Sequence, residues 1–266
     1  MKYFTKVTGT LLILLFLTSC GSVPLTGRRQ VLLVSDAEVL TASLTQYESY
    51  MKTAVKSTDK NKTAMVERVG KRIAAATENY LKQNGMENEL GNFKWEFSCI
   101  KDDAINAFCM PGGKIVVFEG LLPLVSSDDE LAVVIGHEVA HAVAKHSNER
   151  MSQEILAQYG AAMVDMALSK RTAIVHELGN AVFGLGAQLG VMLPYSRKHE
   201  YEADYLGLVF MTIGGYNPNS ALTFWQKMAA ASGNGAASDV LSTHPSDNKR
   251  IAEIQRHLPE MEKLRK

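Results

Sequence analysis

Residues 131–141 read LAVVIGHEVAH, an apolar run that ends in the pattern His-Glu-x-x-His. If this run is helical, His137 and His141 lie about 40° apart around the helix axis and roughly 6 Å apart along it. Both imidazoles can therefore bind the same cation. Glu138 lies beside them and can take a proton from a water molecule that the metal holds, which is the arrangement of a zinc hydrolase.

The residues before this run predict a well-defined start for the helix. Ser127 is followed by Asp128, Asp129 and Glu130, which matches a capping box with two further acids in the first turn. These acids complement the partial positive charge at a helix N-terminus. The alternative is that the His-Glu-x-x-His pattern arose by chance. Its position on a capped apolar helix favours the metal-binding interpretation.

The composition bounds the class of protein. The chain has 266 residues, of which 46% are hydrophobic, and this is enough apolar material for one sizeable core in a single domain. Lys and Arg together number 28, as do Asp and Glu. Because there is no excess of positive charge, we expect no nucleic-acid partner.

The start of the chain has the pattern of an export signal. Lys2 and Lys6 precede the apolar run 11–17, which is too short to span a bilayer comfortably. Charged residues followed by a short apolar run are typical of a cleaved signal peptide rather than of a membrane helix. We therefore expect a signal peptide over residues 1–19.

Residues 17–21 read LTSCG and resemble the lipobox of bacterial lipoproteins, in which the cysteine becomes the acylated first residue. The resemblance implies lipidation of Cys20. Residues 22–35, with Pro24 and Gly27, are typical of a tether, so we expect a lipidated tether over 20–34 and one catalytic domain over 35–266. Gly21 after the cysteine is similar to lipoproteins that are sent to the outer membrane. The alternative is an ordinary signal peptide with an incidental cysteine.

An alternating pattern between residues 92 and 118 predicts three short strands. Apolar residues alternate with polar ones over 93–99, and two further apolar runs follow at 106–109 and 115–118. Pro111-Gly112-Gly113 predicts a tight turn between the second and third strands. The small sheet would lead directly into the His-Glu-x-x-His helix.

This layout is that of the zincin fold, in which a strand edge facing the cleft holds the peptide substrate by β-addition. We assign substrate binding to Asn106, Ala107 and Phe108, with an ordinary core hairpin as the alternative. Cys99 and Cys109 could face each other across the hairpin. A disulfide between them and two buried thiols are equally compatible with the sequence.

Another helix is predicted to begin at Ser196. Within it, Glu200 and Asp204 are four residues apart and share one helix face, from which Glu202 is turned by about 200°. One carboxylate could complete a zinc site while the other orients a ligand imidazole, and a solvated charged face is the alternative. A shared face for both roles selects Glu200 over Glu202, which we expect to be replaceable.

The remaining patterns complete a fold that we expect to be α+β and mainly helical, with a zincin-like catalytic domain. Helices are predicted over about 35–83, 149–168 and 221–231. Residues 178–195 are apolar and rich in glycine without a clear period, which indicates a flap or a packed loop near the cleft. We expect four histidines to be structural or to lie on the surface, namely His146, His176, His199 and His257.

Together these features resemble the gluzincin peptidases typified by the CAAX prenyl endopeptidase and the heat-shock membrane protease HtpX, which include bacterial lipoproteins. The resemblance runs from about Arg28 to Ile251. Its marks are, in chain order, Asn106-Ala107-Phe108 with Pro111-Gly112-Gly113, His137-Glu138-Val139-Ala140-His141, Ser196-Arg197 before Glu200-x-x-Ala203-Asp204, and Thr243-His244-Pro245 with Arg250-Ile251. The metzincin scheme is excluded, because Ala144 and Ser147 stand where it requires Gly and His.

The resemblance implies a role for each residue of the site. It implies one Zn²⁺ per chain with ligands His137, His141 and Glu200, a general base Glu138, an oxyanion-binding His244, and an Asp204 carboxylate that orients His137.

The same resemblance implies a function. We expect a zinc-dependent endopeptidase that cleaves misfolded or envelope proteins in the periplasm, held by its lipid at the bacterial outer membrane. We find no transmembrane helices of the kind that flank the catalytic parts of the CAAX endopeptidase and HtpX, which argues against prenylated substrates. The alternative is a zinc-stabilised outer-membrane assembly chaperone with little proteolytic activity.

Overall fold

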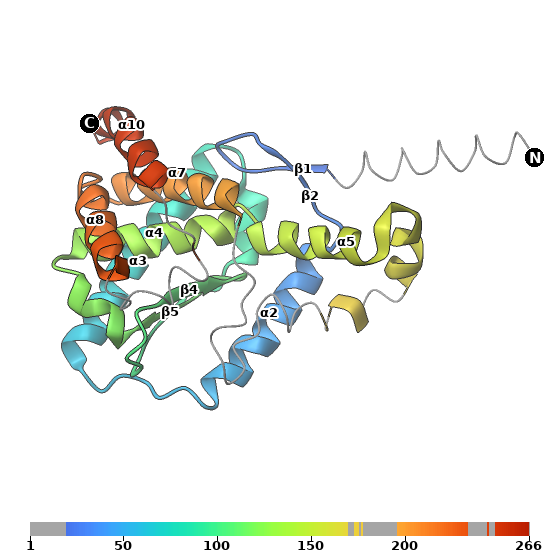
Figure 1. Cartoon of the computed structure of the whole chain (residues 1–266), viewed down its shortest axis with the longest axis horizontal. Helices are drawn as coiled ribbons and strands as arrows, with labels where there is room; N and C mark the ends of the chain where they lie inside the picture. Colours follow the sequence, from blue (N-terminus) through green and yellow to red (C-terminus); the bar gives the residue numbers. More distant parts are fainter. Residues whose placement is uncertain are drawn as a thin grey trace, which may run out of the picture.

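The computed structural model describes residues 20–169, 173–175, 177, 196–233, 244 and 248–265 (Figure 1). Helices make up most of this part of the chain, together with a three-stranded sheet and a two-stranded hairpin. The predicted class, α+β and mainly helical, is confirmed. The elements are arranged around α4 (Asp128–Val143), the helix that carries the His-Glu-x-x-His pattern.

Helix α4 is buried on almost every side. Every residue from Glu130 to His141 is buried, because α4 lies between α7 (Arg197–Ile213) and the sheet and also packs on α3 (Lys60–Gln83) (Figure 1). A helix that is apolar along this much of its circumference is stable only in such an interior position. The metal-binding pattern is therefore held in the centre of the fold.

Ser127 caps α4 as the sequence predicts, because its hydroxyl accepts a hydrogen bond from the Glu130 N–H at 3.3 Å. The second half of the predicted capping box is replaced. The Glu130 carboxylate accepts from the Ser126 N–H at 2.7 Å and from Lys227 Nζ, also at 2.7 Å. Glu130 thereby connects the start of α4 to α8 (Ser220–Gly233).

Three strands precede α4, as predicted. They are β3 (Glu96–Ile100), β4 (Ala107–Met110) and β5 (Lys114–Phe118), in the spatial order β3, β5, β4. β4 and β5 form an antiparallel hairpin around the predicted turn at 111–113, whereas β3 runs parallel to β5. β4 is thus an edge of the sheet. Two short 3₁₀ helices flank the sheet in sequence, η1 (Glu87–Asn92) before it and η2 (Glu119–Leu124) after it.

The strand order decides the question of a disulfide. Cys99 on β3 is paired with Val117, and Cys109 on β4 is paired with Ile115, so that β5 lies between the two cysteines. Two strand spacings amount to about 10 Å, which exceeds the roughly 7 Å limit for the Cα atoms of a disulfide. Both cysteines are free and buried thiols.

Two helices occupy the region predicted to be helical over 35–83. α2 (Asp36–Met51) and α3 are separated by residues 52–59. α3 packs against α4, α7 and β3, as expected of a scaffolding helix. The buried face of α3 includes Val66, Val69 and Ile73.

The helix after α4 begins earlier than predicted. α5 (His146–Ser169) follows directly on Lys145, whose φ of 56° lies in the left-handed region and ends α4. Residues 146–148, predicted to be a polar break, form the first turn of α5. The break between the two helices is therefore only Ala144 and Lys145.

α7 begins after Ser196, as predicted, and the Ser196 hydroxyl accepts from the His199 N–H at 3.3 Å. α7 packs along α4, and α10 (Asn248–Leu264) packs on both α7 and α8. The predicted helix over 221–231 corresponds to α8. The flap or loop predicted over 178–195 lies outside the described residues.

Residues 20–34, the expected tether, include a hairpin that packs on the body of the fold. β1 (Cys20–Ser22) pairs antiparallel with β2 (Arg29–Val31). Val23 and Val34 are buried with exposures of 2% and 4%.

Residues 1–19, the expected signal peptide, lie outside the described part of the chain. The lipidation of Cys20 and the division at residues 19 and 34 stay predictions. Within the described ranges, no helix is both long enough and apolar enough to cross a membrane.

Candidate metal centre

Three imidazoles and one carboxylate meet in the interior of the fold. They belong to His137 and His141 on α4, to Glu200 on α7, and to His244, and each of these residues is at most 4% exposed. One ligand atom from each residue lies within 4.8 Å of the ligand atoms of the others. The structure thus brings together the three predicted metal ligands and the predicted oxyanion-binding histidine.

The donor atoms of this cluster lie close together, and the shortest nitrogen–oxygen distance joins Nδ1 of His244 to Glu200 Oε1 at 3.2 Å. Nε2 of His137 lies 3.1 Å from Nε2 of His141, and each nitrogen lies 3.4 Å from an oxygen of Glu200. Nδ1 of His244 lies 3.3 Å from Nε2 of His137. Two imidazoles and a carboxylate are the donor set of many catalytic zinc sites. The buried donors therefore fit Zn²⁺, with His244 close enough to be a fourth donor.

Asp204 holds the far side of the His137 ring. Its Oδ1 lies 2.9 Å from Nδ1 of His137, while Glu200 from the same helix face approaches Nε2. The shared face predicted for Glu200 and Asp204 is present. A carboxylate in this position orients a metal-binding imidazole and sets its tautomer.

Arg250 from α10 fixes Asp204 in turn. Its guanidinium donates to both carboxylate oxygens of Asp204, with two distances of 2.7 Å. It also lies 2.8 Å from Glu200 Oε2 and 3.9 Å from the centre of the Trp225 ring. No local pattern in the sequence singled out Arg250 as a supporting group, and only the family resemblance included it.

Glu138 lies on the other side of the cluster, next to the sheet edge. Its Oε2 accepts a hydrogen bond from the Cys109 N–H at 3.1 Å, and its Oε1 lies 3.5 Å from Nε2 of His244. Glu138 is 4% exposed. Burial raises the pKa of this carboxyl above its usual value.

The other pKa shifts in the cluster follow from burial and from neighbouring charge. Burial opposes the charge on His137, but Asp204 and Glu200 outweigh it and raise the pKa of this imidazole to about 9. For Glu200, burial is outweighed by His244, His137 and His141, and the pKa lies well below its usual value. Burial lowers the pKa of His141 well below its usual value. The cluster thus combines a stabilised carboxylate with imidazoles that differ in basicity.

Three residues behind His141 make contacts that the sequence did not predict. His146, which was expected to be structural or to lie on the surface, is buried with its Nδ1 2.8 Å from Nδ1 of His141, and burial lowers the pKa of His146 to about 4. Glu202 was expected to be replaceable, but it is 7% exposed and lies 3.0 Å from Nε2 of His146. Arg28 donates to Glu202 at 2.7 Å. Only tertiary structure brings these residues together, because His146 and Glu202, and likewise Arg28 and Glu202, are more than 50 positions apart in the sequence.

Two other histidines fit the expectation in different ways. His199 is buried and stacks on His146, with ring centres 4.4 Å apart. His257 is partly exposed beside Glu253 and Glu260. His176 lies outside the described residues.

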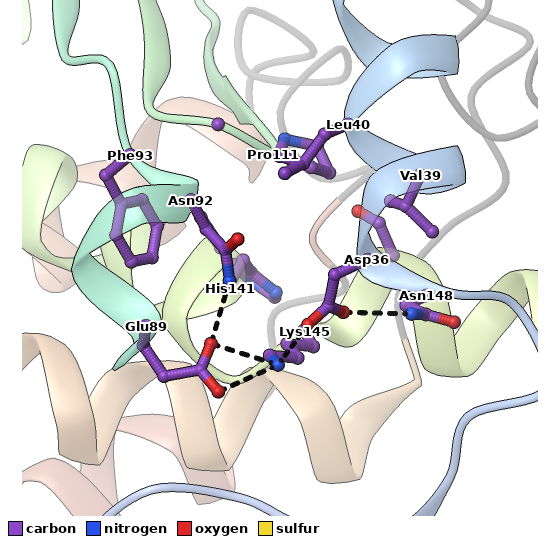
Figure 2. Close-up of a pocket in the computed structure, with 13 residues that line it drawn as sticks. Asp36, Val39, Leu40, Glu89, Asn92, Phe93, Pro111, His141, Lys145 and Asn148 are labelled. Carbon is purple, nitrogen blue, oxygen red and sulfur yellow. Dashed lines mark hydrogen bonds and ion pairs between the residues drawn. The ribbon is translucent and has the colours of Figure 1, made fainter. Parts of the chain in front are cut away.

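Among the pockets lined by α4 are two that also contact β4 or the turn that follows it. Figure 2 shows one of them, which is lined by His141 and in which Lys145 lies 2.6 Å from Asp36 and 3.0 Å from Glu89. Pro111, at the end of β4, lies across this pocket from Lys145. The residues that line the second pocket include Ala107, Glu138 and His244 together with the apolar side chains of Leu121, Val134, Phe224, Trp225 and Met228. The two pockets thus lie at the two ends of β4.

The site is that of a zinc-dependent peptidase, because a helical His-Glu-x-x-His pair is completed by a glutamate from a second helix. The sequence profile described as Peptidase family M48 matches residues 60–258. The chain belongs to this family of zinc metallopeptidases. The predicted enzyme class, a zinc metalloendopeptidase, and the predicted cofactor are confirmed. The match establishes the family and does not single out the lipoprotein branch.

Curated relatives agree with this assignment. The chain is 41% identical over 206 residues to the mitochondrial metalloendopeptidase OMA1 of Schizosaccharomyces pombe, which covers 74% of this chain and 53% of the relative. It is 27% identical to human metalloendopeptidase OMA1, mitochondrial, over 97% of this chain and 49% of the relative. It is also 27% identical to the β-barrel assembly-enhancing protease of Escherichia coli, over 63% of this chain and 35% of the relative. The chain thus spans about half the length, or less, of the curated relatives it matches.

These relatives overturn the expected location. The relatives with identities of 41%, 40% and 31% are all mitochondrial metalloendopeptidases by name, whereas the bacterial proteases match at 28% and 27%. The prediction of a lipid-anchored protein at the bacterial outer membrane is wrong. It depended on the signal peptide predicted over residues 1–19 and on the lipobox-like residues 17–21, which do not identify a compartment by themselves.

Proposed function

We propose that this chain is a zinc endopeptidase that hydrolyses peptide bonds in extended, unfolded segments of polypeptide. His137, His141 and Glu200 would hold one zinc ion, which supplies Lewis acidity that polarises the scissile carbonyl and eases the deprotonation of water. One observation carries this proposal. The buried carboxylate of Glu138 lies 3.5 Å from His244, within the cluster that brings His137, His141 and Glu200 together.

Glu138 would hold and move the proton. Its burial raises the pKa of the carboxyl, so that Glu138 is a stronger base towards water than an exposed glutamate is. The Cys109 N–H holds Oε2, which leaves Oε1 on the side of His244. After the attack on the carbonyl, the same carboxyl would pass its proton to the leaving amine.

His244 would stabilise the negative charge that develops on the carbonyl oxygen. Three protein ligands are sufficient for a catalytic zinc, so we assign His244 to the oxyanion and not to permanent metal binding. Its Nε2 lies 3.5 Å from Glu138, which supports a position next to the reacting group. Donors of this type typically contribute about 10²–10³ in kcat.

The edge of β4 would bind the substrate main chain. The carbonyl groups of Asn106 and Met110 face the hairpin partner: they accept from the N–H groups of Phe118 in β5 and of Gly113 in the turn before β5, at 3.0 and 3.1 Å. Because this direction alternates along a strand, the main-chain groups of Ala107 and Cys109 face away from β5. The Cys109 N–H reaches Glu138 in this direction, which supports the assignment.

The substrate-binding residues predicted from the sequence were Asn106, Ala107 and Phe108. The register favours the main-chain carbonyl groups of Ala107 and Cys109 for this role, because the N–H groups of these two residues are bound to Asn106 Oδ1 and Glu138. A peptide added along β4 would pass from the apolar pocket at Ala107 to the pocket at Pro111 (Figure 2). Ala107 and Cys109 are 4% and 6% exposed, so the segments that cover β4 must move for a peptide to enter.

This mode of recognition supports a role in protein quality control. Main-chain groups of a folded protein are already paired, so only unfolded or extended segments can add to a strand edge. We therefore propose misfolded polypeptides as the substrate class.

Digestion of casein and of a stably folded protein, with and without a zinc chelator, tests this function. We expect the enzyme to cleave casein but not the folded protein. Cleavage of casein should stop when the chelator is added and return when zinc is restored. Cleavage that persists after zinc is removed would contradict the proposal. Binding of casein without cleavage by the zinc-loaded protein would favour the chaperone alternative.

A further inference from the structure

Two histidines of the candidate centre are held at Nδ1 by buried chains of polar contacts. Behind His137, Asp204 lies 2.9 Å away and is bound by Arg250. Behind His141, the series of contacts is longer. It passes through His146 at 2.8 Å and then reaches a second carboxylate and a second arginine.

The series of contacts behind His141 is continuous. Nε2 of His146 lies 3.0 Å from Oε2 of Glu202, and the same oxygen accepts from Arg28 Nε at 2.7 Å. His146 and Glu202 are 0% and 7% exposed. The contacts join the start of α5, the first turns of α7 and the hairpin of β1 and β2.

The Glu202 carboxylate at the end of this series of contacts fixes the position of each proton. An ionised carboxylate only accepts hydrogen bonds, so a neutral His146 carries its proton on Nε2 and donates it to Glu202. Nδ1 of His146 is then an acceptor and faces Nδ1 of His141. His141 must therefore carry its proton on Nδ1, which leaves a bare lone pair on Nε2.

The bare nitrogen is the one that faces the cluster. Nε2 of His141 lies 3.1 Å from Nε2 of His137 and 3.4 Å from Glu200. A neutral imidazole binds a metal through its unprotonated nitrogen, and the group that receives its other N–H fixes both tautomer and ring orientation. The contacts behind His141 thus select the tautomer of this residue that binds a metal through Nε2.

We propose that His146, Glu202 and Arg28 are positioning residues that hold His141 in its metal-binding tautomer and orientation. The inference rests on the proposed assignment of His141 as a zinc ligand. It makes the N-terminal hairpin part of the metal centre, because Arg28 extends from that hairpin. Arg28 is further held by both oxygens of Glu149 on α5, at 2.9 and 2.7 Å.

Glu149 offers a matched control for Glu202. Both glutamates are 7% exposed, both are bound by Arg28 at 2.7 Å, and each contacts one histidine, His146 at 3.0 Å and His199 at 3.1 Å. His146 is the one that continues to His141. Replacement of either glutamate by Ala removes a similar amount of buried charge and packing.

The experiment measures zinc affinity by competition with a chelator in the wild type, Glu202→Ala and Glu149→Ala. We expect Glu202→Ala to weaken zinc binding by about 10–100-fold, the usual effect of losing a group that orients a ligand. Glu149→Ala should stay within about threefold of the wild type, although both variants should melt at lower temperature without metal. Equal zinc affinities in the two variants would overturn the inference.

A spectroscopic measurement keeps the test decisive if an Ala variant fails to fold. In that case ¹⁵N NMR of the histidine rings reads the two tautomers directly in the zinc-loaded wild type. We expect His146 to be protonated at Nε2 and His141 at Nδ1. Protons on the opposite ring nitrogens in the wild type would refute the inferred role of His146, Glu202 and Arg28. A wild type that binds no zinc would refute instead the proposed function.

Discussion

The main chains of Gly136 and Gly207 are in direct contact where α4 crosses α7. A Cβ atom on Gly207 would lie 2.8 Å from the backbone nitrogen of His137, and one on Gly136 would lie 2.9 Å from the carbonyl oxygen of Gly207. Glycine in a helix interior costs roughly 0.5–1 kcal/mol relative to alanine. Here the cost is offset by an approach that brings Glu200 to the histidines of α4.

We expect Gly207→Ala to separate these two helices. The added methyl group meets main-chain atoms of α4, which have little freedom to yield, so the free energy of unfolding should fall by about 1–3 kcal/mol. Zinc affinity should fall as well, because α7 carries Glu200. Gly91→Ala is the control, since a Cβ there meets nothing within 4 Å and its φ is not positive. Thermal melts and chelator competition would contradict this account if both variants behaved alike.

Glu138→Gln should bind one zinc ion per chain and lose cleavage. The amide is nearly the same size and can still accept from the Cys109 N–H, but it does not take a proton from water. We expect kcat to fall by at least about 10²-fold at unchanged zinc content. Metal analysis and a peptide-cleavage assay measure the two quantities. Loss of zinc in this variant would mean that Glu138 supports the metal.

Glu200→Ala and Asp204→Asn should differ in how strongly they reduce zinc binding. Loss of Glu200 removes a ligand that lies within 3.4 Å of both histidines of α4, so stoichiometric zinc should be lost. Asp204→Asn keeps the ligands but weakens the contact that orients His137, and we expect a loss of about 10–100-fold in affinity. A stronger effect of Asp204→Asn than of Glu200→Ala would reverse the two roles.

The parts of the site that the sequence predicted are those encoded by local spacing. Residues 137 and 141 lie one helical turn apart, as do 200 and 204, so the helical period alone places each pair on one face. The strands and the turn at 111–113 follow from alternation and glycine in the same way. These patterns do not depend on where the rest of the chain lies.

The parts that the sequence did not predict are set by contacts between distant segments. The insertion of β5 between β3 and β4, which separates Cys99 from Cys109, depends on strand order, and no local pattern encodes that order. Helical spacing placed Glu202 on a different face of its helix from Glu200. It gave no sign that Arg28 and His146 lie on the side to which Glu202 points.

Acid should destabilise the fold through Glu149. Burial raises the pKa of this carboxyl, but hydrogen bonds from His199 and Arg28 outweigh burial and hold the pKa at about 2. Because the folded-state pKa lies below the ordinary value, the ionised form stabilises the fold above about pH 4.5, and the contribution is lost as the pH falls towards 2. Its size at neutral pH is roughly 3 kcal/mol.

Urea melts between pH 7 and pH 2 would measure this contribution. We expect the difference in unfolding free energy between the wild type and Glu149→Gln to be largest at neutral pH and to shrink through this range. A difference that does not change with pH would show that the effect of the substitution comes from packing. The metal-free forms of both proteins should be compared, so that loss of zinc in acid does not contribute.

The proposed role of the β4 edge makes a prediction about the substrate and not about the enzyme. If a peptide adds to this edge, the direction of its main-chain groups alternates along its sequence. Every second residue faces Ala107 and Cys109, and the residues between them face away from β4. N-methylation removes an amide donor and adds bulk at one residue at a time without changing a side chain. In a peptide that the enzyme cleaves, we expect kcat/KM to fall on the order of tenfold or more at every second residue around the scissile bond. Methylation of the intervening residues serves as the control and should have little effect, whereas a scan without alternation would refute strand addition at β4.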